Sequence, residues 1–291
     1  MSVQADQFPP VLSTQTAVLT TLYENDSLEQ FDIAVGSIEA QAGFGAYTRI
    51  YLCCDGPLPT RHESWLEQNA SRFYKIVRNA QNEGLAKSLN ALLEVLEDES
   101  FVFRMDGDDI SHPERFRSQI AYLEANPELG LIGCQVTDID DSGKPSGQRN
   151  FPLSHDACTR ALRCLNPVLH PTYCMRGDVA RDPATRYPVA FLSEDLAFLV
   201  TLVERGVKIG NCPDRVFSWR LGSRFFERRS SLKRGLAELY WYSRAIRARN
   251  GLLTADYCLA VARFLLRVAP AGFMRMIYQS PLRTKVMNGR A

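Results

Sequence analysis

Four short apolar runs mark the first part of the chain, and segments with helical periodicity separate them. The runs cover residues 17–23, 49–54, 73–77 and 101–105. Each has the length and the apolar content of a buried strand. Between them apolar residues recur every three or four positions, as in Leu28, Phe31, Val35 and Ile38. Strands that alternate with helices in this way predict an α/β domain whose sheet is largely parallel.

The pattern is less regular in the second half of the chain. A helix is predicted over 113–125, and an irregular excursion or hairpin over 137–169. A further helix follows residue 193, with Ser193 as its expected N-cap. Further strands are predicted at 129–136, 170–176, 207–209 and 216–219.

Charge is divided unevenly along a chain whose net charge is only +1. From Arg220 onward there are 15 Lys and Arg against 3 Asp and Glu, whereas residues 1–219 carry 19 basic and 30 acidic side chains. The tail, 230–291, also shows helical periodicity. A basic amphipathic helix either lies on an anionic membrane surface or packs on its own domain with a solvated face, and both interpretations stay open. No nucleic-acid-reading motif accompanies the charge, so we expect no nucleic-acid partner.

Polar residues follow the predicted strands where a parallel sheet binds ligands, at the carboxyl ends. They are Tyr23, Glu24, Asp55, Asn82 and the cluster Asp106–Asp109. Two like charges 4 Å apart repel by roughly 4 kcal/mol at an effective dielectric of about 20. A divalent cation bound by oxygen ligands would remove that cost. The alternative for an isolated Asp-x-Asp is a solvated turn.

Several classes of protein are disfavoured. Neither a Gly-x-Gly-x-x-Gly motif nor a P-loop motif occurs, which argues against dinucleotide-binding and P-loop proteins. The eight cysteines lack Cys-x-x-Cys spacing and lie mostly in apolar runs, so we expect a reducing, cytoplasmic location. No secretory signal and no apolar run of transmembrane length is recognisable.

The order of these features resembles glycosyltransferase family 2, the inverting, nucleotide-sugar-dependent enzymes with a GT-A fold, and in particular bacterial enzymes of surface-polysaccharide synthesis. The resemblance covers about residues 17–222. It is carried by the segments 18–26, Asp55-Gly56, 82–90, 105–127, 166–172, Glu194-Asp195 and 219–222. The stretch from Met105 to Pro127 is the most similar and is far longer than a chance Asp-x-Asp. It therefore favours the functional interpretation of the aspartates over the solvated turn.

The resemblance implies roles for individual residues. Donor contacts are implied for Tyr23, Glu24, Asp55, Asn82, Lys87 and Asp106, with Asp55 near the nucleotide base and Lys87 orienting the diphosphate. Asp108, together with Asp106, would hold Mg²⁺ or Mn²⁺, which supports charge on the leaving diphosphate. Asp195 would be the catalytic base, with Glu194 as the second choice. Acceptor-side positions are implied for His170, Thr172 and Arg220.

The sequence also departs from the family pattern. Thr21 and Glu24 replace the usual Pro and Asn of the first loop, and Lys87 stands where an Arg is common. Many relatives carry a His two residues after the position of Arg220, where this chain has Gly222, which leaves the closing of the metal or diphosphate site in doubt.

We therefore predict a GT-A domain over 1–225 (Rossmann-like, with a mostly parallel sheet flanked by helices) and a basic amphipathic helical extension over 226–291. The predicted function is transfer of a sugar from a nucleoside-diphosphate donor, with UDP preferred, to a glycan hydroxyl. The acceptor would be a lipid-linked oligosaccharide on the inner face of the cytoplasmic membrane. The alternatives are a catalytically degenerate sugar-nucleotide-binding protein and a nucleotidyltransferase, although the latter usually has a glycine-rich phosphate loop after the first strand.

Overall fold

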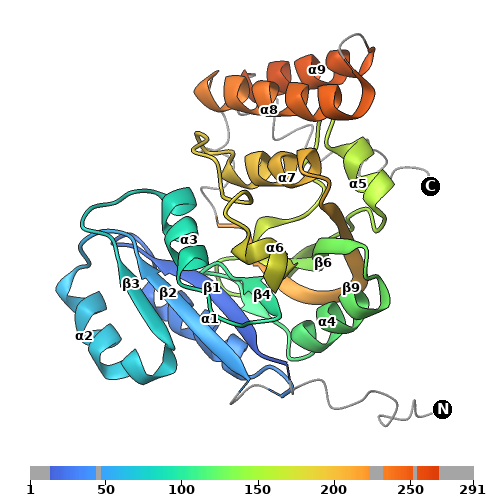
Figure 1. Cartoon of the computed structure of the whole chain (residues 1–291). Coiled ribbons are helices and arrows are strands. Elements are labelled where there is room, and N and C mark those ends of the chain that lie inside the picture. Colours follow the sequence, from blue (N-terminus) through green and yellow to red (C-terminus); the bar gives the residue numbers. More distant parts are fainter. Residues whose placement is uncertain (1–13, 44–46, 223–231, 252–253, 269–291) are drawn as a thin grey trace.

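The computed structural model describes residues 14–43, 47–222, 232–251 and 254–268 (Figure 1). Its strands are β1 Thr16–Leu22, β2 Thr48–Cys54, β3 Lys75–Arg78, β4 Phe101–Arg104, β5 Ile110–Ser111, β6 Leu129–Ile139, β7 Pro145–Arg149, β8 Cys174–Arg176 and β9 Lys208–Arg220. Its α-helices are α1 Leu28–Glu39, α2 Thr60–Asn69, α3 Leu85–Glu94, α4 Arg115–Ala125, α5 His155–Ala161, α6 Gly177–Arg181, α7 Glu194–Glu204, α8 Leu232–Asn250 and α9 Asp256–Val268. The predicted α/β class is confirmed.

One mixed sheet runs through the molecule in the order β3-β2-β1-β4-β8-β6-β9-β5, with β7 paired to β6. Strands β3, β2, β1 and β4 are mutually parallel, so their carboxyl ends meet at one edge. β8 runs antiparallel to both β4 and β6, and β6 and β9 are parallel to each other. The parallel half therefore carries the edge where the sequence predicts ligand binding.

Two apolar cores cover the two faces of the sheet. One core contains Phe31 and Val35 of α1, Leu66 of α2 and Phe116 of α4. The other core is formed mainly by α3, α7 and the first tail helix. In Figure 1 this second layer rises from the sheet through α6 and α7 to α8 and α9. The apolar stripes of the predicted helices thus decide which helix covers which face.

The tail helices pack on the rest of the protein. Trp241, Tyr242 and Ile246 of α8 belong to the same core as α7. Ion pairs also join the tail to the domain, including Arg163 to Asp256 at 2.6 Å and Arg244 to Glu204. One face of the tail is therefore structural. The predicted boundary at 225/226 lies in 223–231, outside the described residues, as does the tail beyond 268.

None of the helices in the described part of the chain is both long and apolar enough to span a membrane. This finding agrees with the absence of such a run in the sequence.

Four sequence predictions need correction in detail. Only 174–176 is a strand, because 170–172 forms a 3-10 turn. The two short strands predicted at 207–209 and 216–219 are one strand, β9, whose register against β6 shifts. The excursion over 137–169 contains the β6–β7 hairpin and the helix α5. Ser193 is the N-cap residue of α7, as predicted, but its side chain makes no capping hydrogen bond, and its hydroxyl donates to the Phe191 carbonyl at 3.3 Å.

Candidate active site

A cavity of about 810 Å³ lies at the carboxyl ends of the parallel strands. Six of the residues singled out in the sequence line it: Tyr23, Asp55, Asn82, Asp106, Asp108 and Arg220. They come from loops after β1, β2, β3 and β4 and from the end of β9. The fold therefore gathers into one cavity residues that are up to 197 positions apart in the sequence.

Asp106 and Asp108 line this cavity, and the buried Asp109 follows directly in the chain. Each offers a carboxylate oxygen, and the three atoms lie within 4.8 Å of one another. The loop is tight because Gly107 passes close to α1, where a Cβ at that position would lie 2.7 Å from the Phe31 ring. β5 follows at once and pairs with Phe217 and Ser218 of β9, which fixes the far end of the loop. The sequence Asp-Gly-Asp-Asp is thus held on both sides by packing.

The charges of the aspartate cluster are only partly compensated. Although the Asp108 side chain is exposed to the cavity, desolvation by the surrounding protein and the charge of Asp106 raise its pKa to about 6. Burial, followed by the charges of Asp108 and Asp106, raises the pKa of Asp109 well above its usual range. Among the described residues Asp109 Oδ2 has no hydrogen-bond partner although it is buried. A buried, unpaired carboxylate oxygen beside two further carboxylates is a donor set that fits a hard divalent cation.

Arg104 is the buried counter-charge of the cluster. Its side chain is fully buried at the end of β4 and forms an ion pair with Asp106. Burial alone would lower the pKa of Arg104, but the charge of Asp106 raises it above the ordinary value. The charges of Arg104 and Arg220 do not prevent the pKa values of Asp108 and Asp109 from rising, so a cation that binds the deprotonated carboxylates would relieve their mutual repulsion.

Arg220 ties the aspartate loop to the β6–β7 hairpin. Its backbone N–H donates to Asp109 Oδ1 at 2.7 Å, and its Nε donates to the Asp108 carbonyl at 2.7 Å. Its Nη1 donates to the carbonyls of Asp140 and Asp141 at 2.8 and 3.0 Å. The side chain lines the cavity, but its hydrogen bonds go to backbone carbonyls. In this structure Arg220 therefore positions the aspartate loop, and an acceptor contact stays a prediction.

Asp55 shapes the wall of the cavity formed by the loops after β2 and β3. Its carboxylate accepts hydrogen bonds from the backbone N–H groups of Glu83 and Gly84, at 2.8 and 3.0 Å, and from the Asn79 side chain at 2.8 Å. These bonds hold the loop that carries Asn82 against β2. Gly56 makes the close approach possible, because it has a positive φ of 96° and a Cβ there would lie 2.7 Å from the Asn82 nitrogen.

Glu194 and Asp195 begin α7 directly after Leu192, which lines the cavity. Asp195 Oδ2 accepts a hydrogen bond from Asn166 Nδ2 at 2.7 Å. Burial and the neighbouring Asp195 raise the pKa of Glu194. The buried Tyr187 is close enough to both Asp195 and Asp106 for their charges to act on it: they add to burial in raising the pKa of its phenol. The predicted base thus adjoins the cavity without being part of its lining.

The remaining predicted residues lie elsewhere. Glu24 is exposed and does not line the cavity. Lys87 also lies outside the lining and pairs with Glu83, so it would have to leave that partner to reach a diphosphate. His170 is buried and shares a hydrogen bond of 3.0 Å with the Tyr187 hydroxyl. Thr172 has no exposed surface and donates to the Leu169 carbonyl at 2.6 Å. His170 and Thr172 therefore support the core behind the site and offer no acceptor contact in this structure.

The cavity is also lined by residues to which the sequence analysis assigned no ligand contact. They are Thr21, Asn25, Asp26, Ser27, Gln30, Gly84, Leu85, Gly107, Asp141, Leu192, Gly222 and Arg234. Asp26 closes the first loop by accepting a hydrogen bond from the Tyr23 N–H at 3.0 Å. Arg234 comes from the first turn of α8 and pairs with Glu238 at 3.0 Å. Its position in a predicted extension, 12 residues after Gly222, gave no local signal of a role at the site.

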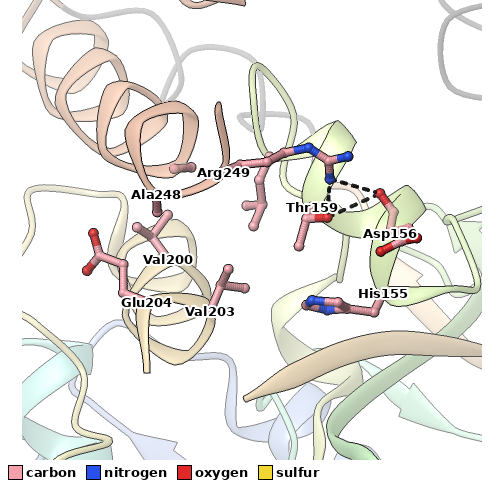
Figure 2. Close-up of a pocket in the computed structure, with 10 residues that line it drawn as sticks. His155, Asp156, Thr159, Val200, Val203, Glu204, Ala248 and Arg249 are labelled. Atoms are coloured by element: carbon pink, nitrogen blue, oxygen red, sulfur yellow. Dashed lines mark hydrogen bonds between the residues drawn. The ribbon is translucent and has the colours of Figure 1, made fainter. Parts of the chain in front are cut away.

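A second cavity of about 600 Å³ lies between α5, α7 and α8 and shares no lining residue with the first. Figure 2 shows Arg249 of α8 reaching across to Thr159 and Asp156 of α5, beside Val200 and Val203 of α7. His155 Nδ1 accepts the Ile209 N–H at 3.1 Å, and burial lowers the pKa of this imidazole. The hydrogen bonds from Arg249 to α5 and the apolar walls make this cavity part of the contact between the tail helix α8 and the rest of the protein.

Comparison with known proteins identifies the family. Residues 32–181 match the model described as Glycosyl transferase family 2. The chain belongs to this family. It is 30% identical over 268 residues to the amylovoran biosynthesis glycosyltransferase AmsE of Erwinia amylovora, covering 90% of this chain and 97% of AmsE. The predicted family and the enzymatic class, glycosyltransferase, are thereby confirmed.

Two further comparisons bear on fold and function. A UDP-Gal:alpha-D-GlcNAc-diphosphoundecaprenol beta-1,3-galactosyltransferase of Escherichia coli is 22% identical over 209 residues, which cover 70% of this chain and 73% of that protein. The solved structure of the mannosyltransferase PcManGT from Pyrobaculum calidifontis, in complex with GDP-Man and Mn²⁺, matches with a TM-score of 0.62 at 14% identity. This match covers 94% of our chain and 84% of PcManGT. The GT-A fold predicted from the sequence is therefore confirmed.

Proposed function

We propose that this glycosyltransferase transfers a sugar, with inversion, from a nucleoside-diphosphate donor to a hydroxyl of a lipid-linked oligosaccharide. The observation that carries the proposal is a cluster of three carboxylates, two of which line a cavity of about 810 Å³ together with Tyr23, Asp55 and Asn82. Glu194 and Asp195 begin α7 close to the cavity residue Leu192. UDP is the preferred nucleotide, because the galactosyltransferase relative named above is UDP-dependent by its name. The name of that relative also motivates the diphosphate-lipid acceptor, and the name of AmsE motivates a role in polysaccharide biosynthesis. The cytoplasmic face of the membrane is retained from the sequence prediction.

Asp106 and Asp108 would hold Mg²⁺ or Mn²⁺, with Asp109 completing the acidic set. A bound cation of this kind stabilises negative charge on a leaving diphosphate as a Lewis acid. Arg220 and Arg234 are cationic side chains that line the cavity, as does Gly222, where many relatives have a His. Because the Arg220 guanidinium is bonded to backbone carbonyls, we assign a diphosphate-facing positive charge to Arg234, in addition to the one implied for Lys87.

Asp195 would act as the base. As the acceptor oxygen attacks the anomeric carbon, its proton passes to the Asp195 carboxylate while the bond from that carbon to the diphosphate oxygen breaks. Attack from the face opposite the leaving group inverts the configuration. Asn166 supports this role, because its Nδ2 donates to Asp195 Oδ2 at 2.7 Å and orients the carboxylate.

The binding test is a thermal-shift screen of the full chain against UDP-, GDP- and dTDP-sugars, with and without Mn²⁺. A ligand at 100 times its dissociation constant stabilises the folded state by about 2.7 kcal/mol. We expect a shift for UDP-sugars that requires the cation. A cation-independent shift would contradict the assignment to the aspartate cluster. If the protein is shown to be folded and none of the sugar nucleotides shifts its Tm, the proposed binding of a nucleoside-diphosphate sugar would be contradicted.

The catalytic test compares Asp195→Asn with Asp178→Asn, an exposed aspartate in the first turn of α6. Loss of a general base lowers turnover about 10²- to 10⁴-fold. We expect this loss in Asp195→Asn together with unchanged donor binding, and normal turnover in the control. Normal turnover in Asp195→Asn would place the base elsewhere. Donor binding without turnover in the wild-type protein would favour the degenerate sugar-nucleotide-binding alternative.

A further inference from the structure

An arginine of the basic tail reaches the cavity of about 810 Å³, which we call the donor cavity. Arg234, in the first turn of α8, lines this cavity. Burial raises the pKa of Glu194 at the start of α7, and the charge of Arg234 opposes this rise, so the two side chains are close together. Arginine has a long side chain, and ordering it at the moment of binding costs conformational entropy. A guanidinium group that is already fixed therefore binds an anion better than a mobile one.

Glu238 holds the guanidinium group of Arg234 from the next turn of the helix. Glu238 Oε1 accepts a hydrogen bond from Arg234 Nε at 3.0 Å. Residues four positions apart lie on the same side of a helix, which allows this contact. Only 13% of the Arg234 side chain and 5% of the Glu238 side chain are exposed. A hydrogen bond through Nε orients the planar guanidinium group, and it is stronger in a buried environment than in water.

A second arginine, from α9, also faces Glu238. Arg263 Nε lies 3.7 Å from Glu238 Oε2, and the Arg263 side chain is 16% exposed. Two positive charges and one negative charge leave this group of three residues with a net charge of +1. Glu238 can thus orient Arg234 without removing the positive charge at the cavity. Such a buried arrangement adds little net stability, because the cost of taking three charges out of water offsets their attraction. Orienting Arg234 is the better account of it.

The tail is anchored to the rest of the protein, which fixes Glu238 relative to the donor cavity. Trp241 and Ile246 of α8 belong to the same core as α7. Asp256, at the start of α9, pairs with Arg163 at 2.6 Å. In Figure 1, α8 and α9 lie side by side above α7.

We propose that Glu238 is a positioning residue of the donor site, which directs the guanidinium group of Arg234 toward the diphosphate of a bound nucleotide sugar. This inference rests on the proposed function, which assigns a diphosphate-facing charge to Arg234. It goes beyond that assignment because it makes the tail helices part of the donor site, whereas the sequence predicts a separate extension over 226–291.

The test uses two conservative variants of the full chain that separate position from charge. Glu238→Asp keeps the negative charge but shortens the side chain, so the carboxylate no longer holds Arg234 in place. Glu238→Gln removes the charge but keeps an oxygen that accepts a hydrogen bond from Arg234 Nε. Dissociation constants for UDP are measured by titration calorimetry in MgCl₂. Those for uridine, which lacks the diphosphate, are measured by competition against UDP.

We expect Arg234→Ala to weaken the binding of UDP about tenfold or more, because a hydrogen bond between charged groups is lost. Glu238→Asp should weaken it by about 2- to 10-fold, the factor that corresponds to ordering one long side chain. Glu238→Gln should keep most of the affinity for UDP, and all three variants should bind uridine like the wild type. Adding Glu238→Asp to Arg234→Ala should have no further effect, because Glu238 acts through the arginine. The matched control is Glu204→Ala, which removes the ion pair of α8 with α7 through Arg244 and should leave both affinities unchanged.

Three results would overturn the inference. Equal weakening of UDP and uridine binding in Glu238→Asp would assign Glu238 to the stability of the tail. Normal UDP binding by Glu238→Asp, or an equal loss in Glu238→Gln, would mean that position is not what Glu238 contributes. A further loss on adding Glu238→Asp to Arg234→Ala would mean that Glu238 does not act through Arg234.

The same titrations distinguish this inference from the proposed function. If the wild type does not bind UDP, the proposed donor is refuted, and this inference with it. Normal UDP binding by Arg234→Ala would refute the charge assigned to Arg234, and this inference with it. Weaker UDP binding by Arg234→Ala together with normal UDP binding by Glu238→Asp would refute the positioning role alone.

Discussion

Replacing Asp108 by Asn should stabilise the protein without metal and at the same time remove its response to metal. Asp108 belongs to three carboxylates whose ligand oxygens lie within 4.8 Å of one another. The substitution keeps the shape of the side chain and removes one negative charge. A binding site that concentrates like charges lowers the stability of the folded protein, so replacing one of these charges can stabilise the fold while function is lost.

The magnitude follows from the geometry. Two like charges 4.8 Å apart repel by roughly 3.5 kcal/mol at an effective dielectric of about 20. Asp108 is exposed on the cavity side, and Arg104 attracts it, so solvent screening and this counter-charge reduce the gain. We therefore expect Asp108→Asn to raise the free energy of unfolding in EDTA by about 1 to 2 kcal/mol, or roughly 2 to 4 °C in Tm.

The assay is thermal unfolding at pH 7.5 in EDTA and in MnCl₂. The wild type should gain stability with Mn²⁺, because the cation binds the folded state, whereas Asp108→Asn should gain much less. Glu128→Gln removes an exposed carboxylate elsewhere and should match the wild type in both buffers. A lower Tm of Asp108→Asn in EDTA, or a full Mn²⁺ shift in this variant, would refute the view that these carboxylates repel one another and form the metal site.

Three further predictions concern the frame of the site. Gly56→Ala should lower the free energy of unfolding, measured in urea, by about 2 kcal/mol and weaken donor binding. The added methyl group would meet the Asn82 backbone, and the position requires a positive φ. Arg220→Lys should lower the free energy of unfolding by about 2 kcal/mol and lower the affinity for Mn²⁺, since lysine cannot make the same three hydrogen bonds to backbone carbonyls. His170→Gln should reduce the loss of stability at acid pH. Burial and the charge of Arg104 lower the pKa of His170, so the folded protein keeps this imidazole neutral. The unfolded chain takes up a proton there as pH falls below about 6.5, and the stability contributed at neutral pH is then lost.

Each of these predictions has a clear contrary result. Wild-type stability in Gly56→Ala would mean that the loop of Asn82 yields to the new methyl group. Unchanged Mn²⁺ affinity in Arg220→Lys would mean that the aspartate loop keeps its shape without the arginine. A wild-type slope of stability against pH between about 7 and 5 in His170→Gln would assign the acid sensitivity to other groups, such as His112 and His155, whose pKa values burial also lowers.

The alternation of strands and helices up to β6 was predictable from local information. Apart from the two-residue β5, which the sequence analysis did not predict, each strand there coincides with a predicted apolar run. Helices such as α1 and α3 carry apolar residues at helical spacing, so one window of sequence contains the signal. The aspartate cluster was predictable for the same reason, because all three carboxylates follow one strand within four residues.

The prediction was weaker where pairing between distant segments decides the structure. β9 is continuous through its polar middle because β6 pairs with it along much of its length. The 3-10 turn at 170–172 is fixed by long-range bonds, among them those from buried Arg115 and Gln119 to the carbonyls of Pro171 and Thr172. Such contacts leave no periodic trace in the segment itself.

The sequence by itself therefore determined the fold class, the family and the acidic centre of the site, because these depend on periodicity and on contiguous residues. Only the tertiary structure decided that His170 and Thr172 are buried and that Lys87 is paired away from the cavity. It also brought Arg234 to the site and Leu192 to its opening. Burial, long-range ion pairs and the position of a tail helix are properties of the packed chain, and a single stretch of residues does not encode them.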